Sequence, residues 1–193
     1  MATTEQAIAV FRERQAQDPT RVEVAGEQRP KALVEAERLA AWVLQLAPGA
    51  SVALRIAPYC QHLERWTVPR ADFPEGRKGY IAWRTSLAKS HAEKAGQALA
   101  ALGFDESVIE EVKRINMKKG LGQASDAQVM EDALCLTFLE FDLPEFAAKH
   151  PREKLLDIIR KTWRKMSDAG HQQASQLQLT PELSELVQAA LAE

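Results

Sequence analysis

Apolar residues recur at intervals of three and four along almost the whole chain, which is the spacing of one face of an α-helix. The clearest stripe lies within residues 30–46 and consists of Leu33, Ala36, Leu39, Ala40, Val43 and Leu46. No stretch shows the alternation of apolar and polar residues that a half-buried strand requires. The sequence therefore predicts an all-α fold, with residues 1–193 forming a single helical domain.

Prolines, glycines and capping residues divide this pattern into separate helices. We expect helices over residues 4–15, 30–46, 51–66, 80–102, 106–117, 126–140 and 151–168, and a last one from residue 180. Residues 18–29 are expected to be irregular, with a short antiparallel pair of strands near 21–25 as the alternative. Residues 67–79 contain two prolines and two glycines and are expected to form a loop with fixed turns. The helix over 126–140 is apolar all round from Ala133 to Leu139, which predicts a central position.

The composition excludes several classes of function. The 193 residues carry a formal net charge of -2, which provides no overall attraction for nucleic acid or for an anionic membrane. No stretch approaches the roughly 20 apolar residues of a membrane span, and the first residues do not resemble a secretory signal. There is no P-loop, Cys-x-x-Cys pair or Gly-x-Ser-x-Gly motif. We therefore expect a cytoplasmic protein that does not act on membranes, and the charge balance disfavours nucleic acid as its ligand.

Two histidines and a pair of carboxylates are the strongest candidates for chemistry. His62 is expected near the end of the third helix, and His91 lies in an apolar stripe between Leu87 and Ala95. A buried imidazole needs a hydrogen-bond partner or a metal, so His91 is either a hydrogen-bonded core histidine or a ligand. Glu131 and Asp132 open the most apolar helix, where at least one of them should face inward. Such a carboxylate belongs either to an internal ion pair or to a metal site.

Basic and aromatic side chains surround these candidates. The residues expected to bind an anion are Arg65, Arg70, Arg84, Lys118 and Lys119. The planar guanidinium group of arginine suits phosphate and carboxylate, and Trp66 or Trp83 could stack on a ring. In the alternative interpretation, these tryptophans are core anchors and the arginines pair with nearby acidic residues. The preferred ligand is a small anionic or phosphorylated molecule.

The sequence between His62 and Arg84 and its surroundings resemble a known family of domains of unknown function, DUF4202. The resemblance rests on Ala57–Trp66, Val68–Arg70, Gly79–Tyr80, Trp83–Arg84, His91–Ala92 and Gln128–Leu136 and extends over nearly the whole chain. It implies no particular activity.

A second resemblance is to the HD superfamily of metal-dependent phosphohydrolases. In that superfamily a histidine, a His-Asp pair and a distant aspartate come from separate helices, and His62, His91 and Asp132 follow the same order. The resemblance implies that these three residues hold a divalent metal ion and are catalytic, with Glu131 as a catalytic candidate that could take the place of Asp132. The chain departs from the pattern at Ala92, which stands where the pair has its aspartate. Glu64, Glu93 or Glu131 could substitute for the aspartate that the His-Asp pair lacks in this chain.

Three functions follow from these observations. The leading hypothesis is a hydrolase of a phosphorylated small molecule such as a nucleotide, in which the metal ion polarises the phosphate and activates water. The second is a non-catalytic helical module that binds an anionic ligand or a partner protein in the same pocket. The third is an RNA-associated protein, which the acidic charge balance opposes.

Overall fold

The computed structural model describes residues 2–121 and 125–192 and is built almost entirely of helices. The elements are α1 (Thr4–Gln15), β1 (Arg21–Val24), β2 (Glu27–Pro30), α2 (Lys31–Leu46), α3 (Val52–Cys60), α4 (Gly76–Ala101), α5 (Glu106–Asn116), α6 (Asp126–Thr137), α7 (Leu143–Lys149), α8 (Arg152–Trp163), α9 (Asp168–Ala174) and α10 (Pro181–Leu191). The predicted all-α class is confirmed.

Side-chain oxygens explain where several of the helices begin. Thr3 accepts a hydrogen bond from the backbone N–H of Gln6, and the Gln6 side chain accepts one from Thr3 in return, which forms a capping box before α1. Ser51, Ser125 and Ser167 cap α3, α6 and α9 in the same way. These caps satisfy N–H groups that the first turn of a helix leaves without partners.

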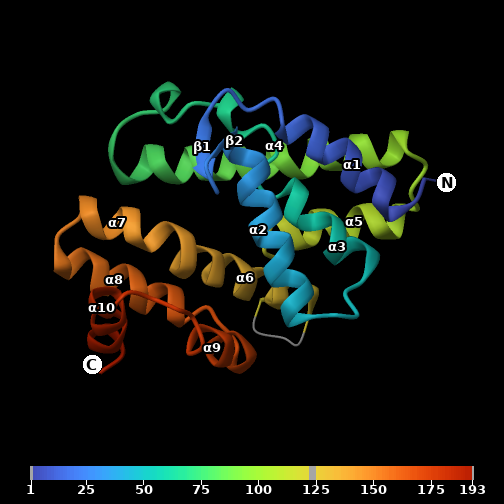
Figure 1. The fold of residues 1–193 in the computed structure, drawn as a ribbon. Helices are drawn as coiled ribbons and strands as arrows, with labels where there is room; N and C mark the ends of the chain where they lie inside the picture. The colour runs from blue at the N-terminus through green and yellow to red at the C-terminus, as the bar shows by residue number, and fades with distance from the viewer. Residues whose placement is uncertain (1, 122–124, 193) are drawn as a thin grey trace.

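Helix α2 is central, because it packs against α3 on one side and α6 on another (Figure 1). Helix α4 lies against α5, while α8 and α10 pack together near the C-terminus. The buried core is one continuous cluster that includes Phe11, Leu54 and Ile115 and extends to Leu186 in the last helix. No helix in the described residues is both long and apolar enough to cross a membrane.

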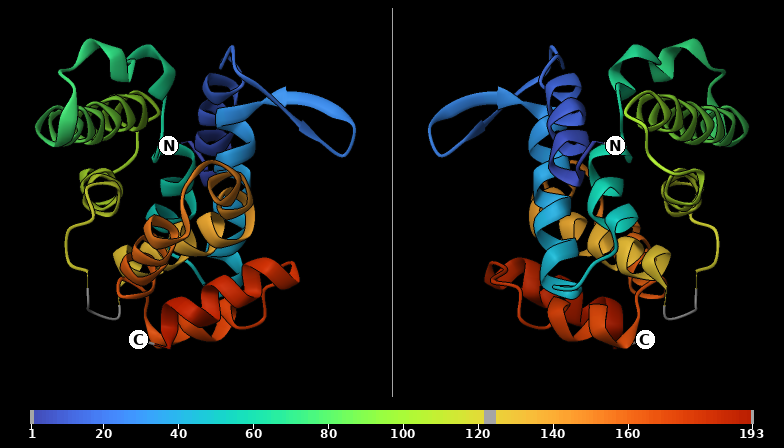
Figure 2. Two further views of the ribbon diagram at one scale, coloured as in Figure 1. Left: turned by 90° about the vertical axis from the view of Figure 1, so that its left-hand side faces the viewer. Right: turned by 90° about the vertical axis from the view of Figure 1, so that its right-hand side faces the viewer.

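Residues 21–30 form a two-stranded antiparallel hairpin and not the expected irregular segment. The alternative prediction of a short antiparallel pair near residues 21–25 is therefore the better one. Arg21 pairs with Pro30 and Val24 with Glu27. Ala25 and Gly26 form its tip with φ values of 51° and 84°, as a two-residue hairpin turn of the primed type requires. The hairpin extends away from the helices (Figure 2), and none of its residues is buried, so it has no buried apolar face by which a sequence pattern could identify its strands.

Other helices end earlier than their apolar patterns suggested. The third helix ends at Cys60, and the chain continues through 3₁₀ turns at Arg65–Thr67 and Arg70–Asp72 to a helix that begins at Gly76. Residues 126–149 form α6, a π-helical turn over Phe138–Asp142, and α7. Residues 152–174 are divided between α8 and α9, because the backbone and hydroxyl of Ser167 bind Asp132 of α6.

Candidate functional site

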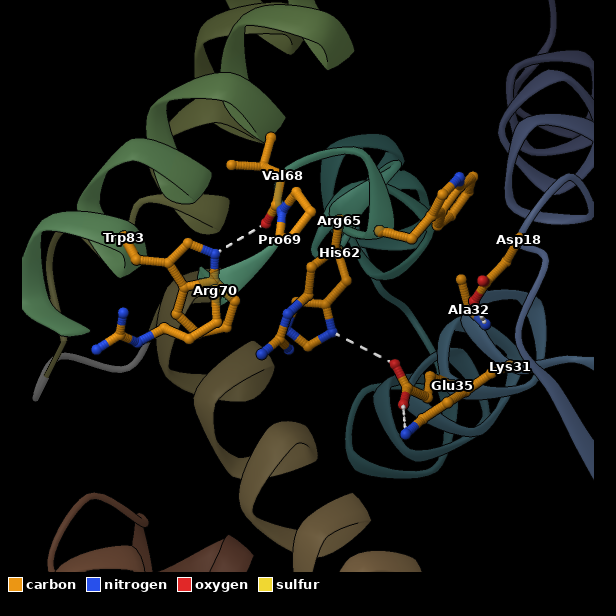
Figure 3. A pocket seen from close by; sticks show the side chains of 11 residues that line it. Asp18, Lys31, Ala32, Glu35, His62, Arg65, Val68, Pro69, Arg70 and Trp83 are labelled. Atoms are coloured by element: carbon orange, nitrogen blue, oxygen red, sulfur yellow. Dashed lines mark hydrogen bonds and ion pairs between the residues drawn. The ribbon is translucent and has the colours of Figure 1, made fainter. Parts of the chain in front are cut away.

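The main pocket lies where the segment after α3 faces α2 and the first half of α4 (Figure 3). Its volume is about 340 Å³. Its walls are formed by Asp18, Lys31, Ala32, Glu35, His62, Arg65, Trp66, Val68, Pro69, Arg70 and Trp83. The pocket therefore combines cationic, aromatic and acidic side chains, and it contains three of the residues predicted from sequence: His62, Arg65 and Arg70.

His62 points across the pocket toward α2, as Figure 3 shows. Its Nδ1 lies 3.8 Å from Oε2 of Glu35, and about a third of its side chain is exposed. Burial acts to raise the pKa of the Glu35 carboxyl, but the nearby His62 and the charge of Lys31 together hold that pKa below its ordinary value. Glu35 is thus an ionised partner for a histidine that ligands can reach. This pairing resembles the carboxylate that orients an imidazole in many acid–base sites.

Arg65 supplies the most available positive charge in the pocket. Its guanidinium carbon lies 4.9 Å from the centre of the Trp83 ring, so the side chain rests on an aromatic face. Among the residues that the structure describes, no carboxylate forms an ion pair with Arg65. Lys31 adds a second cation, 3.7 Å from the other oxygen of Glu35. An incoming anion would find both cations on opposite walls.

Arg70 lines the pocket but is already engaged. Its guanidinium donates hydrogen bonds to the carbonyl oxygens of Phe73 and Pro74 at 2.8 and 2.9 Å. Trp83 is buried and donates from its indole nitrogen to the carbonyl of Val68, at 2.9 Å. These bonds fix the segment before α4 against that helix. They make Arg70 a brace for the pocket wall and Trp83 an anchor, as the alternative interpretation of the tryptophans held.

His91 lies directly behind His62. The centres of the two rings are 6.2 Å apart in an edge-to-face arrangement. His91 is only 4% exposed, and burial together with the nearby charge of His62 lowers its pKa to about 3, although a hydrogen bond to the Gln61 backbone acts in the opposite direction. Within the described part of the chain its Nε2 has no hydrogen-bond partner. His91 is therefore a neutral imidazole that supports the ring of His62.

The two carboxylates of α6 are buried, as predicted for at least one of them, and each is bound by residues outside the pocket. Glu131 is 3% exposed and pairs with Nζ of Lys118 at 2.5 Å and Nζ of Lys165 at 3.8 Å. Asp132 is 2% exposed and accepts three hydrogen bonds, two from Ser167 and one from the side chain of Gln128. All of these partners come from the region where α6 meets the residues around Lys118 and the start of α9.

The remaining predicted anion-binding residues also lie outside the pocket wall. Arg84 donates to the hydroxyl of Tyr80 at 3.3 Å on the exposed face of α4. Lys118 is the ion-pair partner of Glu131, and Lys119 is exposed and accepts from Arg114 through its backbone carbonyl. The structure thus brings together His62, Arg65 and Arg70, with His91 behind them, and places the other candidates elsewhere.

A protein-bound metal ion needs several ligating side chains close together. Within residues 2–121 and 125–192, no three His, Cys, Asp or Glu side chains form a group that could hold one. His62 and His91 could offer two adjacent imidazoles, but the oxygens of Asp132 are occupied by Ser167 and Gln128. The divalent metal stays a prediction from sequence, and no step of the function proposed below depends on it.

Sequence reasoning missed Glu35 and Lys31. Both lie on the first turns of α2, beside the apolar stripe, at a spacing of four residues. This spacing indicates a helical ion pair but gives no sign of His62, which is brought to Glu35 only by the packing of α3 on α2.

Comparison with known proteins gives one match. The family model described as "Domain of unknown function (DUF4202)" matches residues 5–187, so the chain belongs to this family. No curated protein and no solved structure matches the chain.

Proposed function

We propose that this member of the DUF4202 family binds a phosphorylated small molecule in the pocket between α2 and the segment after α3. The observation that carries the proposal is Arg65, a cation held against Trp83 on the pocket wall without a carboxylate partner among the described residues. Lys31 provides a second charge across the cavity. A phosphate with two cationic donors would form the charge-assisted hydrogen bonds that stabilise bound anions most strongly.

The cavity also suits a ligand larger than a phosphate ion. Its volume of about 340 Å³ lies near the lower end of the range typical of small-molecule sites. Trp66 is half-buried and lines the pocket, so its ring provides an aromatic surface for a base or another flat group. A nucleoside monophosphate is therefore the preferred probe.

Hydrolysis of the bound phosphate ester is the second candidate, and the His62–Glu35 pair favours it. An imidazole oriented by a carboxylate can accept a proton from an attacking water molecule and return it to the leaving oxygen. His91 behind His62 would limit the motion of that ring. The metal-dependent form of this reaction, which the resemblance to the HD superfamily implies, would use His62 and His91 as ligands and would also require a carboxylate from residues 131–132 or elsewhere.

Calorimetric titration with adenosine monophosphate and with inorganic phosphate tests the binding proposal. Arg65→Ala should weaken binding by about 1.5–3 kcal/mol, since it removes hydrogen bonds to a charged group. Arg84→Ala is the matched control, because this arginine lies on α4 but outside the pocket wall, and it should leave the affinity unchanged. Equal affinity of the wild type and Arg65→Ala, or equal losses in both variants, would rule out this pocket as the phosphate site.

The same proteins test hydrolysis. If His62 is the base, His62→Gln should lower the rate of phosphate release by about 10²–10⁴-fold while binding is retained. If the wild-type protein binds the nucleotide but releases no phosphate, with or without added divalent metal ions, hydrolysis is excluded and only the binding proposal stands.

A further inference from the structure

One residue between the pocket residues His62 and Arg65 has an unusual backbone conformation. Glu64 has φ 55° and ψ 33°, which is the left-handed helical region. Residues other than glycine, asparagine and aspartate rarely occupy this region, because their Cβ atom approaches the following carbonyl oxygen. Such conformations persist where surrounding contacts determine them, so the contacts of Glu64 indicate what holds this turn.

The carboxylate of Glu64 is tied to two helices at once. Its Oε1 accepts from Nε of Arg14 on α1 at 2.6 Å and lies 2.5 Å from Nη2 of the same guanidinium. Its Oε2 accepts from Nζ of Lys94 on α4 at 2.7 Å. The side chain of Glu64 is only 22% exposed, which limits the screening of these pairs by water.

The turn that these contacts hold separates the two pocket residues that the proposed function requires. His62 precedes Glu64 by two residues and its carbonyl accepts from the backbone N–H of Arg65 at 3.1 Å. The carbonyl of Glu64 in turn accepts from the backbone and hydroxyl of Thr67, at 3.0 and 2.8 Å. This tight reversal directs His62 toward α2 and Arg65 toward Trp83 on α4.

From this geometry we infer that Glu64 is a positioning residue: its ion pairs with Arg14 and Lys94 lock a left-handed turn that places His62 and Arg65 on the pocket wall. The inference rests on the proposed function, because that proposal assigns Arg65 to ligand binding and His62 to the hydrolysis that is its second candidate. It links the site to α1 and α4, neither of which contributes an ion pair to the ligand-binding groups themselves.

A simple stabilising role for Glu64 is the competing explanation, and Glu37 provides a matched control. The side chain of Glu37 is also 22% exposed and also pairs with two cations, Arg12 and Arg29, each at 2.7 Å. Glu37 lies on α2 and does not line the pocket. Replacement of either glutamate by glutamine keeps the shape and removes the charge, so both variants lose two ion pairs but only one loses the lock on the turn.

The experiment compares Glu64→Gln with Glu37→Gln in the full chain. Titration with adenosine monophosphate should show about tenfold or greater weakening for Glu64→Gln and little change for Glu37→Gln, even if both melt at similarly reduced temperatures. Nuclear Overhauser contacts between the rings of His62 and His91, measured without ligand, should weaken only in Glu64→Gln. Equal affinities and unchanged ring contacts in the two variants would overturn the inference.

Two further measurements keep the outcomes separate. If Glu64→Gln fails to fold, Arg14→Gln removes half of the lock from outside the turn and should reproduce the loss of ring contacts. If the wild type binds neither adenosine monophosphate nor phosphate, the proposed function is wrong. In that event the ring contacts still decide whether Glu64 positions the turn.

Discussion

Two neighbouring histidines have different chemical roles because their surroundings differ. His62 is partly exposed, and its Nδ1 lies 3.8 Å from the ionised carboxylate of Glu35. His91 is almost fully buried, and burial and the charge of His62 lower its pKa to about 3. His62 is therefore a ring that a ligand can reach, whereas His91 stays neutral over the whole range near neutral pH.

The lowered pKa of His91 predicts a loss of stability in mild acid. Below about pH 6.5 the unfolded chain takes up a proton at this residue while the folded chain does not, so the free energy of unfolding falls as the pH is lowered toward the folded-state value. The slope from one such group is about 1.4 kcal/mol per pH unit. His91→Gln should remove this part of the slope between about pH 6.5 and about pH 5, a range above the pKa of most carboxyl groups.

Urea unfolding at a series of pH values in this range measures the slope directly. His62→Gln serves as the comparison: it should keep most of the slope, because burial is the largest cause of the lowered pKa of His91 and the charge of His62 is a smaller one. Parallel curves for the wild type and His91→Gln would show that His91 takes up its proton as readily in the folded protein as in the unfolded chain.

At the scale of secondary-structure elements, the pocket wall depends on how closely residues 68–75 approach α4. A Cβ atom at Gly79 would lie 1.7 Å from the carbonyl oxygen of Pro74, far inside the contact distance. The backbone of this segment therefore rests directly on the first turn of the helix. Arg70 and Trp83 add hydrogen bonds to the same segment, so its position is fixed from both ends.

This close approach predicts that Gly79→Ala is disruptive. The added methyl group must displace the backbone around Pro74, which should cost about 1–3 kcal/mol as overpacking does elsewhere and should weaken nucleotide binding at the adjoining wall. Gly49→Ala is the control, since a Cβ there meets nothing within 4 Å. Denaturant unfolding of both variants, followed by calorimetry, checks the prediction; similar stability of the two would contradict it.

The junction of α6 with α9 is a second element-scale feature, and it explains Asp132. The Asp132 carboxylate accepts from the backbone and hydroxyl of Ser167, and a Cβ at Gly170 would lie 2.9 Å from this carboxylate. The aspartate thus binds the N-terminal turn of α9, where its negative charge is favoured by the helix dipole. The expected burial of Asp132 made it a candidate site residue in the sequence, and this contact accounts for that burial.

Asp132→Ala should therefore reduce stability far more than it affects the pocket. It leaves the part-buried donors of Ser167 without their acceptor and removes one acceptor of the Gln128 side chain, which predicts a loss of about 2–4 kcal/mol. Asp157→Ala, which breaks an exposed ion pair with Lys161, should cost no more than about 1 kcal/mol. A large loss of nucleotide affinity in Asp132→Ala at temperatures where it is folded would instead assign Asp132 to the site.

Local signals in the sequence predicted most helices but only part of the site. Stripes such as that of residues 31–46 identify helices because each depends only on nearby residues. The third helix ends at Cys60, four residues before the left-handed Glu64, and the contacts of Glu64 with Arg14 and Lys94 come from distant parts of the chain. Glu35 was missed for the same reason, because only tertiary packing brings it to His62.

At the scale of the whole molecule, the pocket joins segments that one continuous core holds in place. Its walls come from the start of α2, the turns after α3 and the first half of α4, and core residues from α1 to α10 pack into a single cluster. The net charge of -2 provides no long-range attraction for an anion. The proposed binding of a phosphate would therefore depend on local cations, chiefly Arg65 and Lys31.

This dependence predicts that phosphate binding does not require a metal ion. The affinity for adenosine monophosphate should be the same before and after dialysis against a chelator, because Arg65 and Lys31 already supply the positive charge. Calorimetry of the dialysed protein, with elemental analysis of the same sample, tests this expectation. The metal-dependent phosphohydrolase would be favoured instead if dialysis lowers the affinity and a divalent metal ion restores it in the wild type. His62→Ala and His91→Ala should then show no such restoration. In that case a carboxylate must move toward the two imidazoles, and Glu131 or Asp132 would have to leave Lys118 or Ser167 to provide it.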